Sequence, residues 1–184
     1  MSNLITKNAI ADSLKKLLLK KPLSSITIND ITKQAGLSRQ AFYYHFQDIP
    51  SLVEWITIRD ANEALKNKEE CNSWQEGFLT IFKLIKEDRA FINNIYHSTS
   101  LDVLTKYLYK LVYPIIFEVV SDKSANTTLS EENKDFITKF YMYAFVPIVL
   151  EWVNKDMKED PNKIVEKVST LLNGTIEHCI DNLK

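Results

Sequence analysis

The stretch Thr27–Phe46, TINDITKQAGLSRQAFYYHF, contains two short helical patterns separated by Gly36. Thr27 can cap the first pattern, and Asp30, three residues later, can complete a capping box. Gly36 can adopt the left-handed conformation that ends a helix, and Ser38 can cap the next one. Two helices joined by so short a turn form a helix-turn-helix. The stretch therefore predicts the functional core of the chain.

The second helical pattern separates apolar residues from hydrogen-bonding residues. At about 100° per residue, Phe42 and Phe46 fall on one side, which predicts the buried side of the helix. The other side carries Arg39, Gln40, Tyr43, Tyr44, His45 and Gln47. The first two suit base edges in a DNA major groove, and the hydroxyl and imidazole groups further along suit phosphates. On this helix alone, a polar side that is merely solvated stays open as an alternative.

This part of the sequence resembles the N-terminal signature of the TetR family of bacterial transcription regulators. An amphipathic first helix, a threonine-led second helix, an alanine-glycine turn and a final Phe-Tyr-x-His-Phe occur in the family's order. The resemblance implies phosphate contacts from Tyr43 and His45 and base-facing positions at Gln40 and Tyr44. Ile49 stands where the family usually has a phosphate-binding lysine. The DNA-contacting candidates are Thr27, Ser38, Arg39, Gln40, Tyr43, Tyr44 and His45.

Formal charge differs between the two parts of the chain. The 184 residues carry a net charge of −1, with 45% hydrophobic and 26% charged residues, as expected of one or two soluble domains. Residues 1–50 contain seven Lys or Arg and three acidic residues, a formal +4 that leaves −5 for the remainder. A basic end joined to an acidic body favours an N-terminal contact with nucleic acid.

The sequence favours an all-α protein of the reducing cytoplasm. Its start lacks a signal-peptide pattern, and the longest strongly apolar run, Ala144–Leu150, is too short to cross a bilayer and contains Pro147. Cys71 and Cys179 are too few for a disulfide framework. Three widely spaced glycines exclude a glycine-rich phosphate loop, and period-two alternation is missing. We therefore expect no membrane span and no cofactor.

A three-helix, helix-turn-helix domain is predicted for residues 1–48. Its first helix, over residues 7–21, has apolar residues at helical spacing and can brace the helix-turn-helix. Thr6 can cap this helix, and Pro22 follows its end. We interpret the lysines near its C-terminus as a solvated face that complements the helix dipole; they are Lys15, Lys16, Lys20 and Lys21.

A helical effector-binding and dimerisation domain is predicted for residues 49–184. It begins with a linker helix over about residues 49–67, which Asp48 can cap and whose first turn holds Pro50. Because this linker starts where the recognition helix ends, a push on it from the body would turn the recognition helix.

Pro114 is expected to kink a helix over about residues 101–120, and kinks of this kind often border cavities. Aromatic and histidine side chains of the body are therefore candidates for an effector pocket: Phe78, Phe82, Tyr96, His97, Tyr107 and Tyr113. Tyrosines at helical spacing are more often half-buried structural residues, and this alternative stays open.

Two helices of the body have enough apolar surface to pair with a second copy of the chain. The helix after Ser130 is apolar on nearly every side from Phe136 to Val153, and the last helix, from Asp160 through Ile180, has a wide apolar stripe. The TetR resemblance also implies dimerisation through the last two long helices, and the C-terminal part is loosely similar to activators of dihydroxyacetone kinase operons. The dimerisation candidates are Tyr143, Val146, Leu150, Val168, Leu172 and Ile176.

Catalysis and metal binding have little support in the sequence. His45, His97 and His178 are dispersed among separate predicted helices, and no nucleophile lies in a strained turn near a base. His178 adjoins Cys179, but neighbouring helical residues diverge by about 100° and make a poor chelate. We expect no enzyme activity and no metal site, with a metal sensor as a weaker alternative.

These features together predict a homodimeric regulator that binds a double-stranded DNA operator. The default expectation is a repressor that an unknown small-molecule or protein effector releases through the C-terminal domain. The alternative is a transcriptional coactivator whose C-terminal domain binds a partner protein and whose own DNA grip is weaker because of Ile49.

Overall fold

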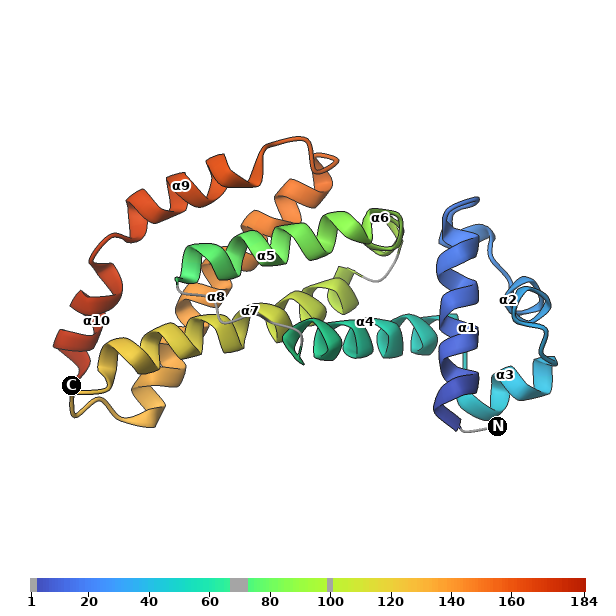
Figure 1. Ribbon diagram of the computed structural model, residues 1–184, viewed down its shortest axis with the longest axis horizontal. Coiled ribbons are helices and arrows are strands. Elements are labelled where there is room, and N and C mark those ends of the chain that lie inside the picture. The colour runs from blue at the N-terminus through green and yellow to red at the C-terminus, as the bar shows by residue number, and fades with distance from the viewer. Residues whose placement is uncertain (1–2, 67–72, 99–100) are drawn as a thin grey trace. The chain divides into compact units, whose positions relative to one another are not determined.

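The computed structural model describes residues 3–66, 73–98 and 101–184 (Figure 1). Within these ranges every regular element is a helix, which confirms the predicted all-α class. The chain divides into two compact units. The N-terminal unit comprises residues 1–63 and 88–104, and the C-terminal unit comprises residues 64–87 and 105–184.

The N-terminal unit is built on the predicted first helix and helix-turn-helix. Its elements are α1 (Asn3–Leu18), η1 (Leu23–Ser25), α2 (Ile28–Ala35), α3 (Arg39–His45), most of α4 (Ile49–Lys66) and α6 (Arg89–His97). Fully buried side chains from α1, α2, α3, α4 and α6 form its core: Ile10, Leu14, Ile31, Phe42, Leu52, Ile56, Ile92 and Ile95. The unit thus extends beyond the predicted 1–48 domain, because α4 and α6 belong to it as well.

The predicted capping signals of the helix-turn-helix are confirmed. The Asp30 backbone N–H donates to Thr27 Oγ1 (3.2 Å), and the Thr27 N–H donates to Asp30 Oδ2 (2.9 Å), which makes a capping box at the start of α2. Gly36 has φ 65°, in the left-handed region, and ends α2. The Ser38 Oγ accepts from the Ala41 N–H (3.1 Å) and caps α3. Local sequence signals therefore set both ends of the turn.

Asp30 also makes α2 sensitive to acid. The Lys21 ammonium donates to its carboxylate (2.8 Å), and this bond, followed by those from Thr27, holds the pKa of Asp30 far below its usual value of 3.8. A carboxylate with a depressed pKa stabilises the fold above its unfolded pKa, and that stabilisation is lost as the pH falls. We expect Asp30→Asn to lower the urea midpoint at pH 6 and to differ much less from wild type at pH 2. An equal difference at both pH values would show that the charge of Asp30 has no role.

The head of α4 also follows the prediction. The Ser51 N–H donates to Asp48 Oδ1 (2.8 Å), and the Asp48 N–H donates to Ser51 Oγ (3.1 Å), with Pro50 in the first turn. α4 ends at Lys66, so residue 67 of the predicted linker lies outside the described residues, as does Cys71.

The C-terminal unit consists of long helices around an aromatic core. They are α5 (Trp74–Glu87), α7 (Leu101–Ser124, from residue 105), α8 (Glu131–Asn154), α9 (Pro161–Leu172) and α10 (Thr175–Leu183). Phe78 on α5 packs against Phe145 on α8, with ring centroids 3.9 Å apart, and Phe82 meets Trp152 edge-on at 4.8 Å. α7 continues through Pro114 as one helix.

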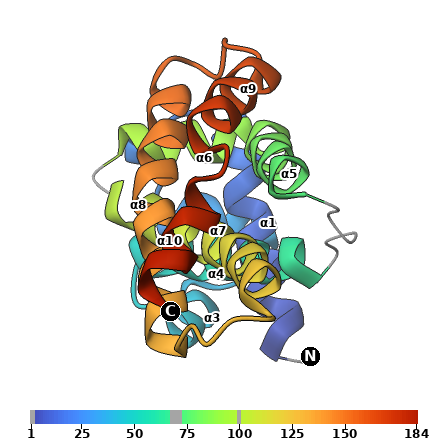
Figure 2. The same cartoon turned by 90° about the vertical axis from the view of Figure 1, so that its left-hand side faces the viewer.

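The prediction of one continuous last helix from Asp160 through Ile180 is wrong. α9 ends at Leu172, and α10 begins at Thr175 in a new direction (Figure 2). Gly174 lies between them with φ 74°, a conformation that a helix cannot contain. Because the apolar stripe continues on both sides of this corner, periodicity alone did not reveal it.

α8 is long and apolar enough, by length and composition, to cross a membrane. Of the most apolar 18-residue stretch of α8, 50% is buried inside the protein. Core helices of soluble proteins have the same property, because a helix that is apolar on most sides is covered by other helices.

Candidate nucleic-acid interface and effector pocket

The outward side of α3 presents the predicted DNA-contacting groups. Thr27, Ser38, Arg39, Gln40, Tyr43 and Tyr44 are exposed and His45 is half-buried. Tyr44 is 79% exposed and Tyr43 is 51% exposed, whereas Phe42, on the buried side of α3, is 0% exposed. An aromatic side chain as exposed as Tyr44 gains little from packing. The candidates of α3 are therefore at least partly accessible to solvent, and so is Thr27, the N-cap residue of α2.

Aromatic packing fixes this surface from below. The Phe42 ring meets Tyr43 edge-on at 5.8 Å and lies 5.9 Å from Phe46. Phe46 in turn meets Trp55 on α4 at 5.7 Å, and the Lys7 ammonium of α1 lies over both of the latter rings at 5.5 and 5.6 Å. α3 is thus held by apolar and cation–π contacts to α1 and α4.

Ile49, which stands where the resemblance implies a lysine, packs beside apolar residues of the N-terminal unit. The side chain is half-buried and lines a largely apolar pocket of about 340 Å³ within the N-terminal unit. The other lining residues are Leu23, Ser24, Pro50, Val53, His97 and Ser98. A lysine ammonium at this position would lie beside the apolar side chains of Leu23, Pro50 and Val53.

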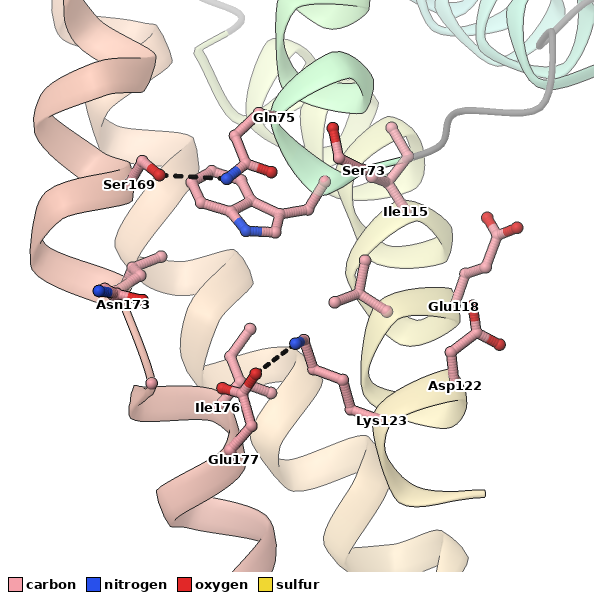
Figure 3. Close-up of a pocket in the computed structure, with 14 residues that line it drawn as sticks. Ser73, Gln75, Ile115, Glu118, Asp122, Lys123, Ser169, Asn173, Ile176 and Glu177 are labelled. Carbon is pink, nitrogen blue, oxygen red and sulfur yellow. Dashed lines mark hydrogen bonds and ion pairs between the residues drawn. The ribbon is translucent and has the colours of Figure 1, made fainter. Parts of the chain in front are cut away.

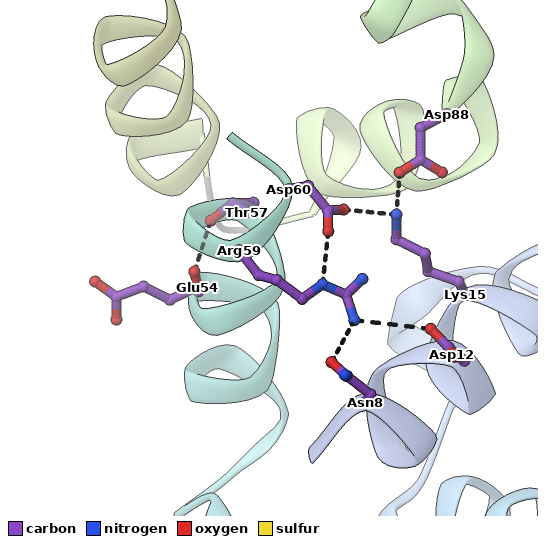
Figure 4. Close-up of polar contacts among 8 residues, drawn as sticks. All are labelled: Asn8, Asp12, Lys15, Glu54, Thr57, Arg59, Asp60 and Asp88. Atoms are coloured by element: carbon purple, nitrogen blue, oxygen red, sulfur yellow. Dashed lines mark hydrogen bonds and ion pairs between the residues drawn. The ribbon is translucent and has the colours of Figure 1, made fainter. Parts of the chain in front are cut away.

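A shared ion pair joins three helices of the N-terminal unit (Figure 4). The Lys15 ammonium of α1 donates to Asp60 Oδ2 of α4 (2.6 Å) and to Asp88 Oδ2 (2.5 Å). Asp88 is the N-cap residue of α6, but its carboxylate makes no cap hydrogen bond. Burial acts to lower the pKa of Lys15, and the bonds to Asp60 and Asp88 outweigh burial and raise it above 10.5.

Arg59 extends this network along α1. Its Nε donates to Asp60 Oδ1 (2.8 Å), its Nη1 donates to Asn8 Oδ1 (3.2 Å), and Asp12 Oδ1 lies 3.7 Å away. The guanidinium also lies over the Trp55 ring at 5.3 Å. The interpretation of Lys15 as part of a solvated lysine face is therefore wrong, because acidic partners from distant parts of the sequence surround it. Lys21 likewise pairs with Asp30, whereas Lys16 and Lys20 are exposed.

The six predicted effector residues do not line one described pocket. Phe78, Phe82 and Tyr107 are buried in the C-terminal unit, with the first two in its aromatic core. Tyr96 and His97 belong to α6 of the N-terminal unit. The remaining candidate, Tyr113, donates its hydroxyl to Asp135 Oδ1 (2.8 Å); burial, and then this bond, raise its pKa to about 12.

A different pocket lies within the C-terminal unit, beside the corner between α9 and α10 (Figure 3). Its volume is about 390 Å³. The lining comes from the start of α5, the C-terminal half of α7, and both sides of the corner: Ser73, Trp74, Gln75, Ile115, Glu118, Val119, Asp122, Lys123, Ser169, Leu172, Asn173, Gly174, Ile176 and Glu177. The sequence could not predict this set, because its members are scattered over four segments.

The dimerisation candidates divide between buried and accessible positions. Val146, Val168 and Ile176 are buried within the unit itself, Leu150 and Leu172 are half-buried, and Tyr143 is 55% exposed. Further exposed apolar side chains that sequence reasoning missed are Phe136, Phe140 and Leu171. The spacing of 136, 140 and 143 places three aromatic rings on one side of α8, a signal that was present in the sequence.

Among the described residues, no group of three or more His, Cys, Asp or Glu side chains is arranged to hold a metal ion. His178 makes its contacts with Asn182, one turn further along α10, and Cys179 lies 3.8 Å from the Tyr141 hydroxyl. The two adjacent residues that suggested a metal sensor therefore face different neighbours.

Comparisons with known proteins agree with this architecture. A family profile described as "Bacterial regulatory proteins, tetR family" matches residues 10–55, and one described as "Transcriptional regulator C-terminal region" matches residues 72–174, more than half of the chain. The dhaKLM operon transcriptional activator DhaS of Lactococcus lactis is 24% identical over 152 residues, which cover 81% of this chain and 80% of that protein. AlkX of Mycobacterium tuberculosis is 30% identical over 66 residues, covering 36% and 31% of the two chains.

Solved structures show the same fold over nearly the whole chain. The dihydroxyacetone kinase operon activator DhaS superposes with a TM-score of 0.72 at 23% identity, covering 95% of this chain and 97% of that one. The TetR family repressor AlkX from Dietzia sp. gives 0.60 at 14% identity, covering 93% and 97%. The chain therefore belongs to the tetR family of bacterial regulatory proteins, and it is a transcriptional regulator.

Proposed function

We propose that the chain is a cytoplasmic, homodimeric repressor that reads a double-stranded DNA operator through α3 and has no membrane partner. The observation that carries the proposal is the exposed, donor-rich side of a capped helix that buried Phe42 holds in place. A repressor needs only its DNA-binding surface, because a protein bound to the operator is enough to obstruct transcription. An activator would also need a surface for a partner protein.

The exposed residues of α3 form two groups, one that can contact bases and one that can contact phosphates. Arg39 and Gln40 lie at the helix N-terminus, where a recognition helix meets base edges. Tyr43 and His45 lie one turn later, where hydroxyl and imidazole groups can contact phosphate oxygens, and the Arg39 Nη2 lies 3.5 Å from the Tyr43 hydroxyl. Tyr44, the most exposed aromatic side chain of the helix, can contact either a base or a phosphate.

A second copy of the chain supplies the second recognition helix. Phe136, Phe140 and Tyr143 on α8, with Leu171 on α9, are exposed apolar side chains that a symmetric partner would cover. Dimeric readers bind half-sites about 34–36 Å apart, or a multiple of that distance. An effector in the C-terminal unit that changed the spacing of the two readers would then lower the affinity for DNA.

Gln40→Ala and Tyr43→Phe separate base reading from phosphate contact. Loss of a bidentate base contact costs about 1–3 kcal/mol of discrimination. We therefore expect Gln40→Ala to lower the ratio of operator to random-DNA affinity by about 5- to 150-fold. Tyr43→Phe keeps the packing on Phe42 but lacks the hydroxyl, so it should weaken binding to both DNAs by a similar factor.

The measurement is a mobility-shift titration with DNA from upstream of the chain's own gene and with random DNA of equal length, at one fixed salt concentration. Tyr109→Phe, a tyrosine of α7 in the C-terminal unit, is the matched control and should leave both affinities unchanged. If the wild-type protein bound both DNAs equally well, the proposal of an autonomous sequence-specific reader would be wrong. A single half-site should bind more weakly than the paired site if the reader is dimeric.

A second candidate function is activation together with a partner protein. Two observations favour it: the relative DhaS is named an activator, and the predicted effector residues Phe78 and Phe82 are filled core positions, not cavity walls. Transcription from the same upstream DNA distinguishes the two, because added protein should reduce transcript under repression and increase it under activation.

A further inference from the structure

We propose that the apolar pocket between η1, the head of α4 and the end of α6 binds a small uncharged molecule with an aliphatic body and one hydrogen-bonding group, and that this ligand weakens DNA binding. The pocket belongs to the N-terminal unit, and its volume of about 340 Å³ lies within the range of about 300–1,000 Å³ that is typical of small-molecule sites. The effect on DNA rests on the proposed function, whereas the binding itself does not.

The apolar part of the lining favours an aliphatic body. Leu23, Ile49, Pro50 and Val53 contribute their side chains. Val53 is buried, and the side chains of Leu23 and Ile49 are half-buried, so the remaining apolar surface of these two is available to a ligand. A ligand that covers this surface with aliphatic groups of its own removes apolar area from water on both sides.

Two polar groups of the lining are left for the ligand. The Ser24 hydroxyl and the His97 imidazole form no hydrogen bond with another described residue, and the His97 ring has an edge-on contact with the Tyr96 ring at 5.2 Å. The Ser98 hydroxyl, in contrast, donates to the Ile95 carbonyl oxygen (2.9 Å). Hydroxyl and imidazole groups can donate or accept, so one hydroxyl or amide group on the ligand would find a partner here.

The composition of the lining favours an uncharged ligand. None of the seven described residues that line the pocket is Asp, Glu, Lys or Arg. An ionised ligand would lose part of its hydration beside apolar side chains without gaining a carboxylate or an ammonium as a partner, which makes its binding costly. A metal ion would find the single imidazole of His97, which is too few ligands for a stable site.

The pocket lies beside both ends of the helix-turn-helix. η1 leads into Thr27, the N-cap residue of α2, and Ile49 begins α4 three residues after Phe46, the C-cap residue of α3. The Leu23 N–H donates to Asn94 Oδ1 on α6 (3.0 Å), so η1 is also tied to α6. A ligand in the pocket would contact the segment that enters the helix-turn-helix, the segment that leaves it and α6. Ligand affinity therefore depends on the spacing of these segments, and by reciprocity the ligand biases that spacing.

The test of binding is an NMR titration of the full-length protein labelled at its Ile, Leu and Val methyl groups. The probe is cyclohexylmethanol, and cyclohexanecarboxylate and cyclohexylmethylammonium present the same body with a negative or a positive charge. The alcohol should shift the methyl signals of Leu23, Ile49 and Val53 until they saturate. The two ions should bind at least about tenfold more weakly, because the lining lacks a partner for their charge.

Ile49→Lys should weaken the alcohol at least about tenfold, because an ammonium would replace an apolar wall of the pocket. Ile58→Lys makes the same change on α4 at a position that is 43% exposed and outside the lining, and it should stay within about twofold of wild type. Ser24→Ala and His97→Leu each remove one hydrogen-bonding group. At least one of them should weaken the alcohol by about two- to tenfold, the usual effect of one hydrogen bond.

A mobility-shift titration of the operator at one fixed salt concentration completes the test. At saturation the alcohol should lower operator affinity at least about fivefold in the wild type and in Ile58→Lys, but not in Ile49→Lys. If the alcohol shifted none of the three methyl groups, bound no tighter than the ions, or left operator affinity unchanged or higher, the inference would be wrong, while operator preference without ligand would still support the proposed function. Conversely, a protein that bound the alcohol at these methyl groups but did not prefer its operator to random DNA would overturn the proposed function and leave the site and its ligand class standing.

Discussion

Replacing Phe42 with alanine is expected to lower the free energy of unfolding by about 3–5 kcal/mol, the usual cost of truncating a fully buried phenylalanine. Phe42 is 0% exposed and contacts the Tyr43 and Phe46 rings, so its loss leaves a cavity beneath the reading surface. Urea denaturation followed by tryptophan fluorescence measures this loss, because Trp55 packs against Phe46 in the same cluster. DNA affinity should fall as well, because α3 would lose its support.

Tyr44→Ala is the matched control for this change. Tyr44 is 79% exposed, and its substitution should leave the free energy of unfolding within about 0.5 kcal/mol of wild type. The same variant should nevertheless bind the operator more weakly, because its side chain lies on the reading surface. A variant of Tyr44 that unfolded as easily as Phe42→Ala, or one of Phe42 that was as stable as wild type, would contradict this division of α3 into a buried and a reading side.

The helix-turn-helix was predictable because its signals are local. Thr27 and Asp30 cap each other within one turn, and Gly36 and Ser38 act on their immediate neighbours, so a sequence of twenty residues contains the information. The division of α3 into buried Phe42 and exposed Tyr43 and Tyr44 also follows from helical periodicity alone.

The C-terminal unit was less predictable because its features depend on contacts between distant segments. The sequence predicts Phe78 and Phe82 as pocket residues, yet α8 brings Phe145 and Trp152 against them. An aromatic stripe is the same in sequence whether another helix or a ligand covers it. The pocket beside the α9–α10 corner was missed for the converse reason, since Trp74 and Asp122 lie 48 residues apart in the sequence, and only the packing of α5 on the rest of the unit brings them to one site.

Lys15 illustrates the same limit within the N-terminal unit. Its neighbours in sequence suggested a solvated lysine face, but Asp60 and Asp88, which bind it, lie 45 and 73 residues away. Asp88 is the N-cap residue of α6, and its position in the sequence predicts a hydrogen bond from its carboxylate to the first turn of that helix. The carboxylate accepts from Lys15 instead. A single ammonium therefore ties α1 to both α4 and α6.

Lys15→Met is expected to lower the free energy of unfolding by about 1–3 kcal/mol, between the cost of losing an exposed and a buried ion pair. The Lys15, Asp60 and Asp88 side chains are 26%, 18% and 35% exposed. Without Lys15, the Asp88 carboxylate would lose this cation, partly screened by solvent, and Asp60 would keep only its bond from Arg59. Lys16→Met, at an exposed neighbouring position, is the control and should have little effect. Adding Asp88→Asn to Lys15→Met should recover part of the loss, because one uncompensated carboxylate is then removed.

The pH dependence gives this prediction a second, independent measurement. Since the pKa of Lys15 is raised in the folded state, its stabilising contribution is complete below the ordinary lysine value of 10.5 and is lost as the pH rises through the raised value. The difference in urea midpoint between wild type and Lys15→Met should therefore be full at pH 7 and become smaller above about pH 11. If the difference persisted unchanged in strong alkali, the loss would come from the packing of the lysine stem on the Phe91 ring, over which its ammonium lies at 5.0 Å, and not from the ion pair. A diminishing difference would instead show that the charge itself holds α4 and α6 against the helix that supports the DNA reader.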